Sequence, residues 1–217
     1  MSKKKVKTKF NIKSIFNYIK KNMLFFIFVV LFIILTTMIF TGLTNKIDEN
    51  ITSYIIGIRN DNLTNTMINI SNIGGAYSLI VISLLLLICI KKKKIPLLII
   101  VNLVIVFFTS QIFKLIFRRP RPDGLYLISE RGFSYPSGHA MVSFAFISFI
   151  IYLLYKYLNN KLAKICISIA LSIIILLIGF SRIYLGVHYL TDVLGGYLLG
   201  ICYLLLYIKI IKGRNYI

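Results

Sequence analysis

The sequence predicts an all-α fold, a polytopic membrane protein built as a six-transmembrane-helix bundle. The first observation is composition: 58% of the 217 residues are hydrophobic, whereas soluble domains average about 45–50%. The second is distribution, because the apolar residues gather in runs near the roughly 20 residues that a helix needs to cross a bilayer core. The third is the absence of strand-like alternation, which matters because only helices or closed barrels satisfy every backbone polar group in lipid.

Residues 1–22 form a basic stretch with eight lysines and a rough helical stripe of apolar side chains. This pattern predicts an amphipathic cytoplasmic segment that lies on an anionic membrane surface. We assign the following residues, 23–210, to a single six-helix membrane domain.

Six apolar runs have the length of a membrane-spanning helix: 23–42, 67–90, 95–117, 138–155, 162–180 and 189–208. The second run is interrupted near its start by Gly74 and Gly75. Between the first two runs, apolar residues from Ile47 to Ile58 recur at helical spacing, which predicts a short helix lying flat at the membrane interface.

The positions of Lys and Arg predict the orientation. With both termini in the cytoplasm, 18 of the 26 basic residues lie on the cytoplasmic side, and all six acidic residues lie outside. This bias satisfies the positive-inside rule and explains the net charge of +20. We therefore expect the chain to contact the lipid bilayer and not nucleic acid, and no obligatory protein partner is indicated.

Eight basic residues remain on the outer side, where the rule disfavours them, and six of these lie in 114–131 or at Arg182. Both histidines of the chain fall in the same outer regions. This combination predicts an anionic ligand at the outer face.

The last polar segment contains His188 and Asp192, four residues apart at the expected start of the sixth helix. This spacing places them on one face, one turn apart. A carboxylate that accepts from one imidazole nitrogen fixes the tautomer and leaves the other nitrogen free to attack an electrophile. A pair that only staples helices together is the alternative.

The middle segment, Pro136 to His139, has the features of a helix start. Ser137 is a candidate N-cap, and Gly138 allows a ligand to approach the backbone closely. The unpaired N–H groups of a helix start bind phosphate, and His139 would lie beside such an anion, where it could donate a proton. A purely structural cap is the alternative.

The first segment supplies cations. Arg121 lies between two prolines that stiffen its backbone, and Arg binds phosphate oxygens in a bidentate manner. Lys114, near the end of the third helix, either binds the anion or extends to the interface. Arg118, Arg119 and Arg131 are either attractors for an anionic substrate or ordinary loop residues.

Together the three segments resemble the type 2 phosphatidic acid phosphatase superfamily, which includes membrane lipid phosphatases and soluble vanadium haloperoxidases. The family pattern is KxxxxxxRP, then PSGH, then SRxxxxxHxxxD. The sequence matches every fixed position in order and spacing: Lys114, Arg121, Pro122, Pro136, Ser137, Gly138, His139, Ser181, Arg182, His188 and Asp192.

The resemblance implies a role for each matched polar residue. His188 would be the nucleophile that forms a phosphohistidine, Asp192 would orient it, and His139 would be the general acid. The phosphate oxygens would be held by Lys114, Arg121, Ser137, Gly138 and Arg182. The resemblance to the phosphatases of this superfamily implies that no metal or other cofactor is needed and that residues 23–210 form a membrane phosphatase domain.

Three other functions share parts of this pattern: a lipid phosphotransferase using the same phosphohistidine, a haloperoxidase, and a membrane transport or lipid-binding protein without catalysis. For a phosphatase, the candidate substrates are undecaprenyl diphosphate, phosphatidylglycerol phosphate and phosphatidic acid. An outward-facing site in the plasma membrane favours undecaprenyl diphosphate, a carrier lipid recycled at that surface.

Overall fold

The computed structural model describes residues 22–123 and 126–216, and within them it contains helices and no strand. The all-α prediction is confirmed. The predicted basic N-terminal segment, residues 1–22, lies outside the described residues except for Asn22. The helices are α2 (Met23–Phe40), α3 (Asn45–Gly57), α4 (Asp61–Ile73), α5 (Ala76–Cys89), α6 (Lys94–Phe117), α7 (Gly138–Tyr157), α8 (Lys161–Tyr184) and α9 (Leu190–Gly213).

Five of these helices are long and apolar enough to cross a membrane: α2, α6, α7, α8 and α9. The pair α4 and α5 meets this test only jointly, so the described residues hold up to six spans if the pair counts as one. The prediction of six crossings therefore depends on this pair.

The prediction of one broken helix over 67–90 is corrected. Helix α4 begins earlier, at Asp61, and the two helices are bent by 49° where they meet. Gly74 ends α4 and Gly75 begins α5 with an extended backbone. Helix α5 alone rises about 21 Å at about 1.5 Å per residue, short of the ~30 Å hydrocarbon core, so this part of the chain crosses the membrane only if α4 completes the span.

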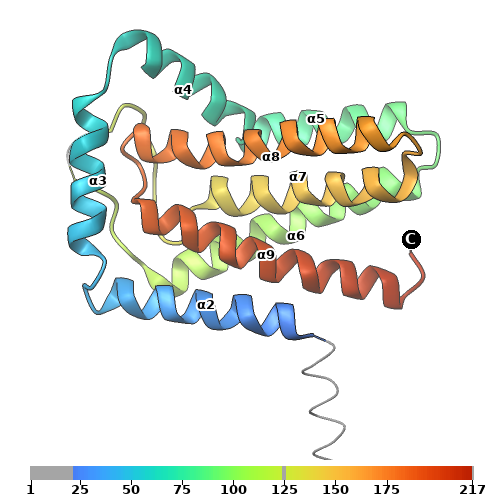
Figure 1. Ribbon diagram of the computed structural model, residues 1–217, viewed down its shortest axis with the longest axis horizontal. Helices are drawn as coiled ribbons and strands as arrows, with labels where there is room; N and C mark the ends of the chain where they lie inside the picture. Colours follow the sequence, from blue (N-terminus) through green and yellow to red (C-terminus); the bar gives the residue numbers. More distant parts are fainter. Residues whose placement is uncertain (1–21, 124–125, 217) are drawn as a thin grey trace, which may run out of the picture.

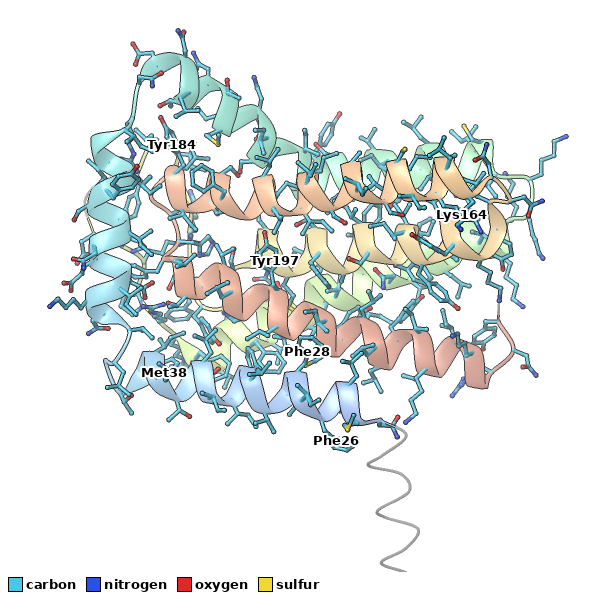
Figure 2. The ribbon with its side chains drawn as sticks, viewed as in Figure 1. Phe26, Phe28, Met38, Lys164, Tyr184 and Tyr197 are labelled. Carbon is cyan, nitrogen blue, oxygen red and sulfur yellow. The ribbon has the colours of Figure 1, made fainter. Side chains whose placement is uncertain are left out.

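Helix α7 lies at the centre of the bundle. It packs against α6, α8 and α9, while α2 packs against α9 on the outside. The core is made of buried apolar side chains such as Val106, Phe146, Phe149 and Ile178. Many large apolar side chains face outward instead, including Met38 on α2 (Figure 2). An apolar exterior is the expected surface for a bundle surrounded by lipid.

One end of the bundle differs from the other. Helix α3 lies across the left end in Figure 1, roughly perpendicular to the long helices, and the segments joining α6 to α7 and α8 to α9 meet there. Tyr184 marks this end of α8 and Lys164 marks the opposite end (Figure 2). The C-terminus lies at the opposite end. The alternating helices thus bring three distant segments of the chain to one place.

Candidate active site

The end of the bundle covered by α3 gathers all the polar residues singled out in the sequence. Lys114 lies in the last turn of α6, Arg182 in the last turn of α8, and His139 in the first turn of α7. His188 lies in the short connection between α8 and α9, which begins at Leu190. His188 therefore lies just before the helix at whose start it was expected from the sequence.

His188 faces Asp192 although it is not helical. The imidazole Nδ1 lies 3.5 Å from Asp192 Oδ2, longer than a normal hydrogen bond. Asp192 accepts a hydrogen bond from the backbone N–H of Tyr189 at 2.9 Å. A carboxylate at this position also stabilises the positive end of the helix dipole. The helix start thus fixes the carboxylate that faces the imidazole.

Burial and nearby cations favour the neutral form of the His188 imidazole. Its side chain is almost completely enclosed. Burial lowers the pKa of His188 well below its ordinary value, and the charges of Lys114, Arg182 and Arg121 lower the pKa further. A neutral imidazole retains one nitrogen lone pair. The arrangement therefore favours the nucleophilic form of the ring.

Arg121 is held beside the imidazole by backbone oxygens. Its guanidinium donates to the carbonyls of Val187 at 2.8 Å, Gly132 at 3.0 Å and Arg131 at 3.0 Å. Its Nη1 lies 3.5 Å from His188 Nε2. Three hydrogen bonds to main-chain carbonyls restrict the guanidinium, so its positive charge stays close to Nε2 of His188.

Two further cations surround the imidazole. The Lys114 ammonium donates to the Phe133 carbonyl at 2.9 Å. Arg182 is 1% exposed, and its Nη1 donates to the Ser71 hydroxyl on α4 at 2.5 Å. Ser71 was not singled out from the sequence, because this serine lies in the predicted run 67–90 and belongs to no motif.

Glu130 forms ion pairs with both arginines. One carboxylate oxygen bonds Arg182, and the other lies 3.8 Å from Arg121 Nη2. The side chain remains 27% exposed. The cations expected to bind phosphate thus hold a carboxylate anion of the protein itself. Sequence reasoning counted Glu130 only among the outer acids.

The start of α7 contributes backbone N–H groups. Ser137 is the N-cap residue, as predicted, but its buried hydroxyl makes no capping bond and has no hydrogen-bond partner. A Cβ added to Gly138 would lie 3.4 Å from Ser110 Oγ and 3.5 Å from Lys114 Cε. The glycine therefore leaves the helix start close to Lys114.

A hollow of about 250 Å³ opens beside His139. Apart from Gly138 and His139, its walls are mainly apolar side chains of α5, α6 and α7, such as Ile80, Phe107 and Phe108. An apolar chain attached to a phosphate bound near His139 would fit such walls.

Arg119 is the largest departure from the sequence interpretation. It is 8% exposed and bonds Asp192 Oδ1 at 2.6 Å and Asp48 Oδ2 at 2.8 Å. From the sequence it was considered an attractor of substrate or an ordinary loop residue, and neither role includes these two buried ion pairs. Within the described residues, no three His, Cys, Asp or Glu side chains gather as a metal site would require.

Comparisons with known proteins agree with the geometry. The family model described as the PAP2 superfamily matches residues 95–216. The chain is 34% identical over 188 residues to phosphatidylglycerophosphatase B of Bacillus subtilis, a match that covers 84% of this chain and 90% of that protein.

Two solved structures resemble the chain. The first is a transmembrane PAP2-type phosphatidylglycerolphosphate phosphatase from Bacillus subtilis, with a TM-score of 0.78 and 30% identity over 86% of this chain and 94% of that one. The second is LpxE of Aquifex aeolicus, with a TM-score of 0.58 and 27% identity over 74% of this chain and 93% of that one.

Proposed function

The chain belongs to the PAP2 superfamily, and we propose that it hydrolyses phosphatidylglycerol phosphate to phosphatidylglycerol and inorganic phosphate. The family match, together with the similarity to the Bacillus subtilis phosphatidylglycerophosphatase B sequence and to the Bacillus subtilis crystal structure, shows a membrane phosphatase that acts on lipid phosphates. The proposal concerns the substrate and the residues that carry out the reaction.

The observation that carries the proposal is a cluster of cations beside an apolar hollow. Lys114, Arg121 and Arg182 surround His188, and the hollow begins at His139. A ligand that suits both must combine a phosphate with an apolar chain. A lipid phosphate has this combination, and a small water-soluble phosphate ester does not.

The choice among lipid phosphates rests on the relative. The sequence alone favoured undecaprenyl diphosphate. The 34% identity over most of both chains to a phosphatidylglycerophosphatase favours phosphatidylglycerol phosphate instead. Undecaprenyl diphosphate and phosphatidic acid remain as comparison substrates in the test.

In the proposed reaction, His188 Nε2 attacks the phosphorus and the bond from phosphorus to the lipid oxygen breaks. His139 gives a proton to that oxygen, which leaves as the lipid hydroxyl. Water then attacks the phosphohistidine, with His139 accepting its proton, and phosphate departs. Asp192 holds the His188 tautomer and stabilises the positive imidazole during attack.

We further propose that hydrogen-bond donors with fixed positions stabilise the negative charge of the transition state. The phosphate oxygens are bound by Lys114, Arg121, Arg182 and the backbone N–H groups at Ser137 and Gly138. Donors that are already oriented need no reorganisation during the reaction, which is why they lower the barrier.

A substrate panel tests the proposal. Purified protein in detergent micelles is given phosphatidylglycerol phosphate, phosphatidic acid or undecaprenyl diphosphate, and phosphate release is followed with and without EDTA. We expect the highest kcat/KM on phosphatidylglycerol phosphate and no effect of the chelator. A higher kcat/KM on another lipid would overturn the substrate, and a loss of activity in EDTA that magnesium restores would overturn the mechanism.

A further inference from the structure

Arg119 joins two buried carboxylates that come from distant parts of the chain. Its Nη1 bonds Asp192 Oδ1 at 2.6 Å and its Nη2 bonds Asp48 Oδ2 at 2.8 Å. Asp48 is 1% exposed and Asp192 is fully enclosed. Charges removed from water at such depth are costly unless they are paired. One guanidinium thus compensates an acid of α3 and an acid of α9.

Asp48 is itself fixed in place by Thr191. Its Oδ1 accepts from the Thr191 N–H at 3.2 Å, and its Oδ2 accepts from the Thr191 hydroxyl at 2.6 Å. The guanidinium also lies 4.3 Å from the centre of the Tyr189 ring, a cation–π distance. Helix α3, which crosses the end of the bundle (Figure 1), is thereby bonded to the first turn of α9.

The two oxygens of Asp192 face different partners. Oδ1 bonds Arg119, whereas Oδ2 accepts from the Tyr189 N–H and faces His188 Nδ1. Among the described residues, Arg119 makes no hydrogen bond with the imidazole, so it acts on the ring through the carboxylate. A carboxylate held at both oxygens presents a fixed lone pair to His188, and that orientation selects the imidazole tautomer.

We propose that Arg119 and Asp48 are positioning residues, which keep Asp192 ionised and aimed at His188 Nδ1. This inference rests on the proposed function of His188 as nucleophile. It makes α3 part of the catalytic arrangement, since α3 supplies the acid that orients the guanidinium. The role replaces both interpretations of Arg119 considered from the sequence.

Four variants test the inference in purified protein: Arg119→Gln, Arg119→Lys, Asp48→Asn and Glu49→Gln. Glu49 is an exposed acid next to Asp48 on α3, so its variant is the matched control. For each we measure kcat, the inhibition constant of inorganic phosphate, the rate of phosphoenzyme formation and the thermal midpoint.

Arg119→Gln should lower kcat and the rate of phosphoenzyme formation by about 10- to 100-fold, by analogy with the loss seen when the partners that orient metal-bound histidines are removed. The inhibition constant of phosphate should stay nearly unchanged, because Arg119 does not touch the anion. Arg119→Lys should recover part of the loss, Asp48→Asn should show a smaller loss, and Glu49→Gln should match the wild type.

A folded Arg119→Gln protein with the wild-type kcat would overturn the inference, as would a parallel loss of kcat and phosphate binding. If Arg119→Gln fails to fold, Asp48→Asn decides, and an Asp48→Asn protein with normal kcat and thermal midpoint overturns the inference. Failure of the proposed function is distinguishable, because it would appear as a missing phosphoenzyme in the wild type.

Discussion

At the scale of single residues, the proposed chemistry depends on the protonation state of His188. Attack on phosphorus requires a neutral ring, and burial together with the charges of Lys114 and Arg182 lowers the pKa of His188. The nearby Asp192 acts in the opposite sense, because it stabilises the positive charge that develops after attack. Burial and the cations therefore favour the neutral imidazole before attack, and the carboxylate favours the positively charged imidazole that forms during attack.

His188→Ala should abolish the phosphoenzyme, because no other nucleophile faces Arg121 in the described site. The measurement uses substrate labelled in its terminal phosphate, quenched in alkaline detergent, since phosphohistidine is unstable in acid. His139→Ala is the comparison and should slow phosphoenzyme formation most for substrates with poor leaving groups. A labelled protein in the His188→Ala sample would remove His188 from the nucleophile role.

The lowered pKa of His188 also predicts how stability depends on pH. The unfolded chain binds a proton on this histidine below about pH 6.5, whereas the folded protein does not until a much lower pH. Stability should therefore fall as the pH drops through the unfolded value, by at most about 1.4 kcal/mol per pH unit. Comparing thermal midpoints of wild type and His188→Gln between about pH 7.5 and about pH 5.5 checks this, and equal slopes would contradict it.

Glu130 should compete with phosphate for the arginines. Its carboxylate pairs with Arg182 and lies near Arg121, so an incoming anion must displace it. Glu130→Gln should therefore lower the inhibition constant of inorganic phosphate, by roughly fivefold if the competition costs about 1 kcal/mol. Asp123→Asn, which removes an exposed acid from the same connection, is the control. An inhibition constant that rises in Glu130→Gln would show that Glu130 supports the cation cluster instead.

The motif residues and their supports differ in how far the sequence can predict them. Lys114, Arg121 and His188 could be found because short fixed spacings set their geometry. The partners Asp48 and Ser71 could not, since they reach the site across 143 and 111 residues of chain. Their side chains carry no local signal, and only the packing of α3 and α4 against the bundle brings them there.

At the scale of helices, the close approach of α9 to α7 positions the helix start that we propose binds phosphate. A Cβ added to Gly196 on α9 would lie 2.7 Å from the carbonyl oxygen of Ser137 and 3.1 Å from Ala140 Cβ. The Ser137 carbonyl accepts the first helical bond of α7, from Met141 at 3.0 Å. The main chain there has little room to move, so the glycine determines where α7 begins.

Gly196→Ala should displace the start of α7 and so weaken phosphate binding and lower kcat. Overpacking of this kind costs about 1–3 kcal/mol of stability, so the thermal midpoint should fall as well. Gly213→Ala is the matched control, because it makes the same change on α9 where a Cβ meets nothing within 4 Å. A Gly196→Ala protein with wild-type phosphate inhibition would show that α7 is positioned by other contacts.

The sequence predicted where the membrane-spanning helices lie, but it did not predict the start of α4 or the start of α9. The apolar runs predicted α2 and α6 to α9, because a spanning helix must be apolar over its whole length. Helix α4 was missed as a separate element, since its polar residues hid the helix before the apolar run. His188 was expected in the first turn of the sixth helix because its spacing to Asp192 suits a helix. In the structure it lies just before α9, and the capping acid Asp192 gives the same proximity.

At the scale of the whole molecule, the proposed active site and most of the described lysines lie at opposite ends (Figure 1). The end covered by α3 holds His139, His188 and Asp192, and the C-terminus lies at the other (Figure 1). The far end also carries most of the described lysines, in the connections after α5 and α7 and in the last turns of α9. Lysine-rich connections remain in the cytoplasm of bacterial inner membranes. The bundle should therefore present its site to the outer side of the plasma membrane.

Single-cysteine labelling in intact cells tests this orientation. The native Cys89, Cys166 and Cys202 are first replaced, and one cysteine is placed at Asp123 or at Lys93. The site end carries Asp123, and Lys93 lies at the start of α6 at the opposite end. A membrane-impermeant maleimide should label the cysteine at Asp123 in intact cells and the one at Lys93 only after lysis. The reverse pattern would place the site in the cytoplasm, and the substrate would then have to reach the enzyme from the inner leaflet.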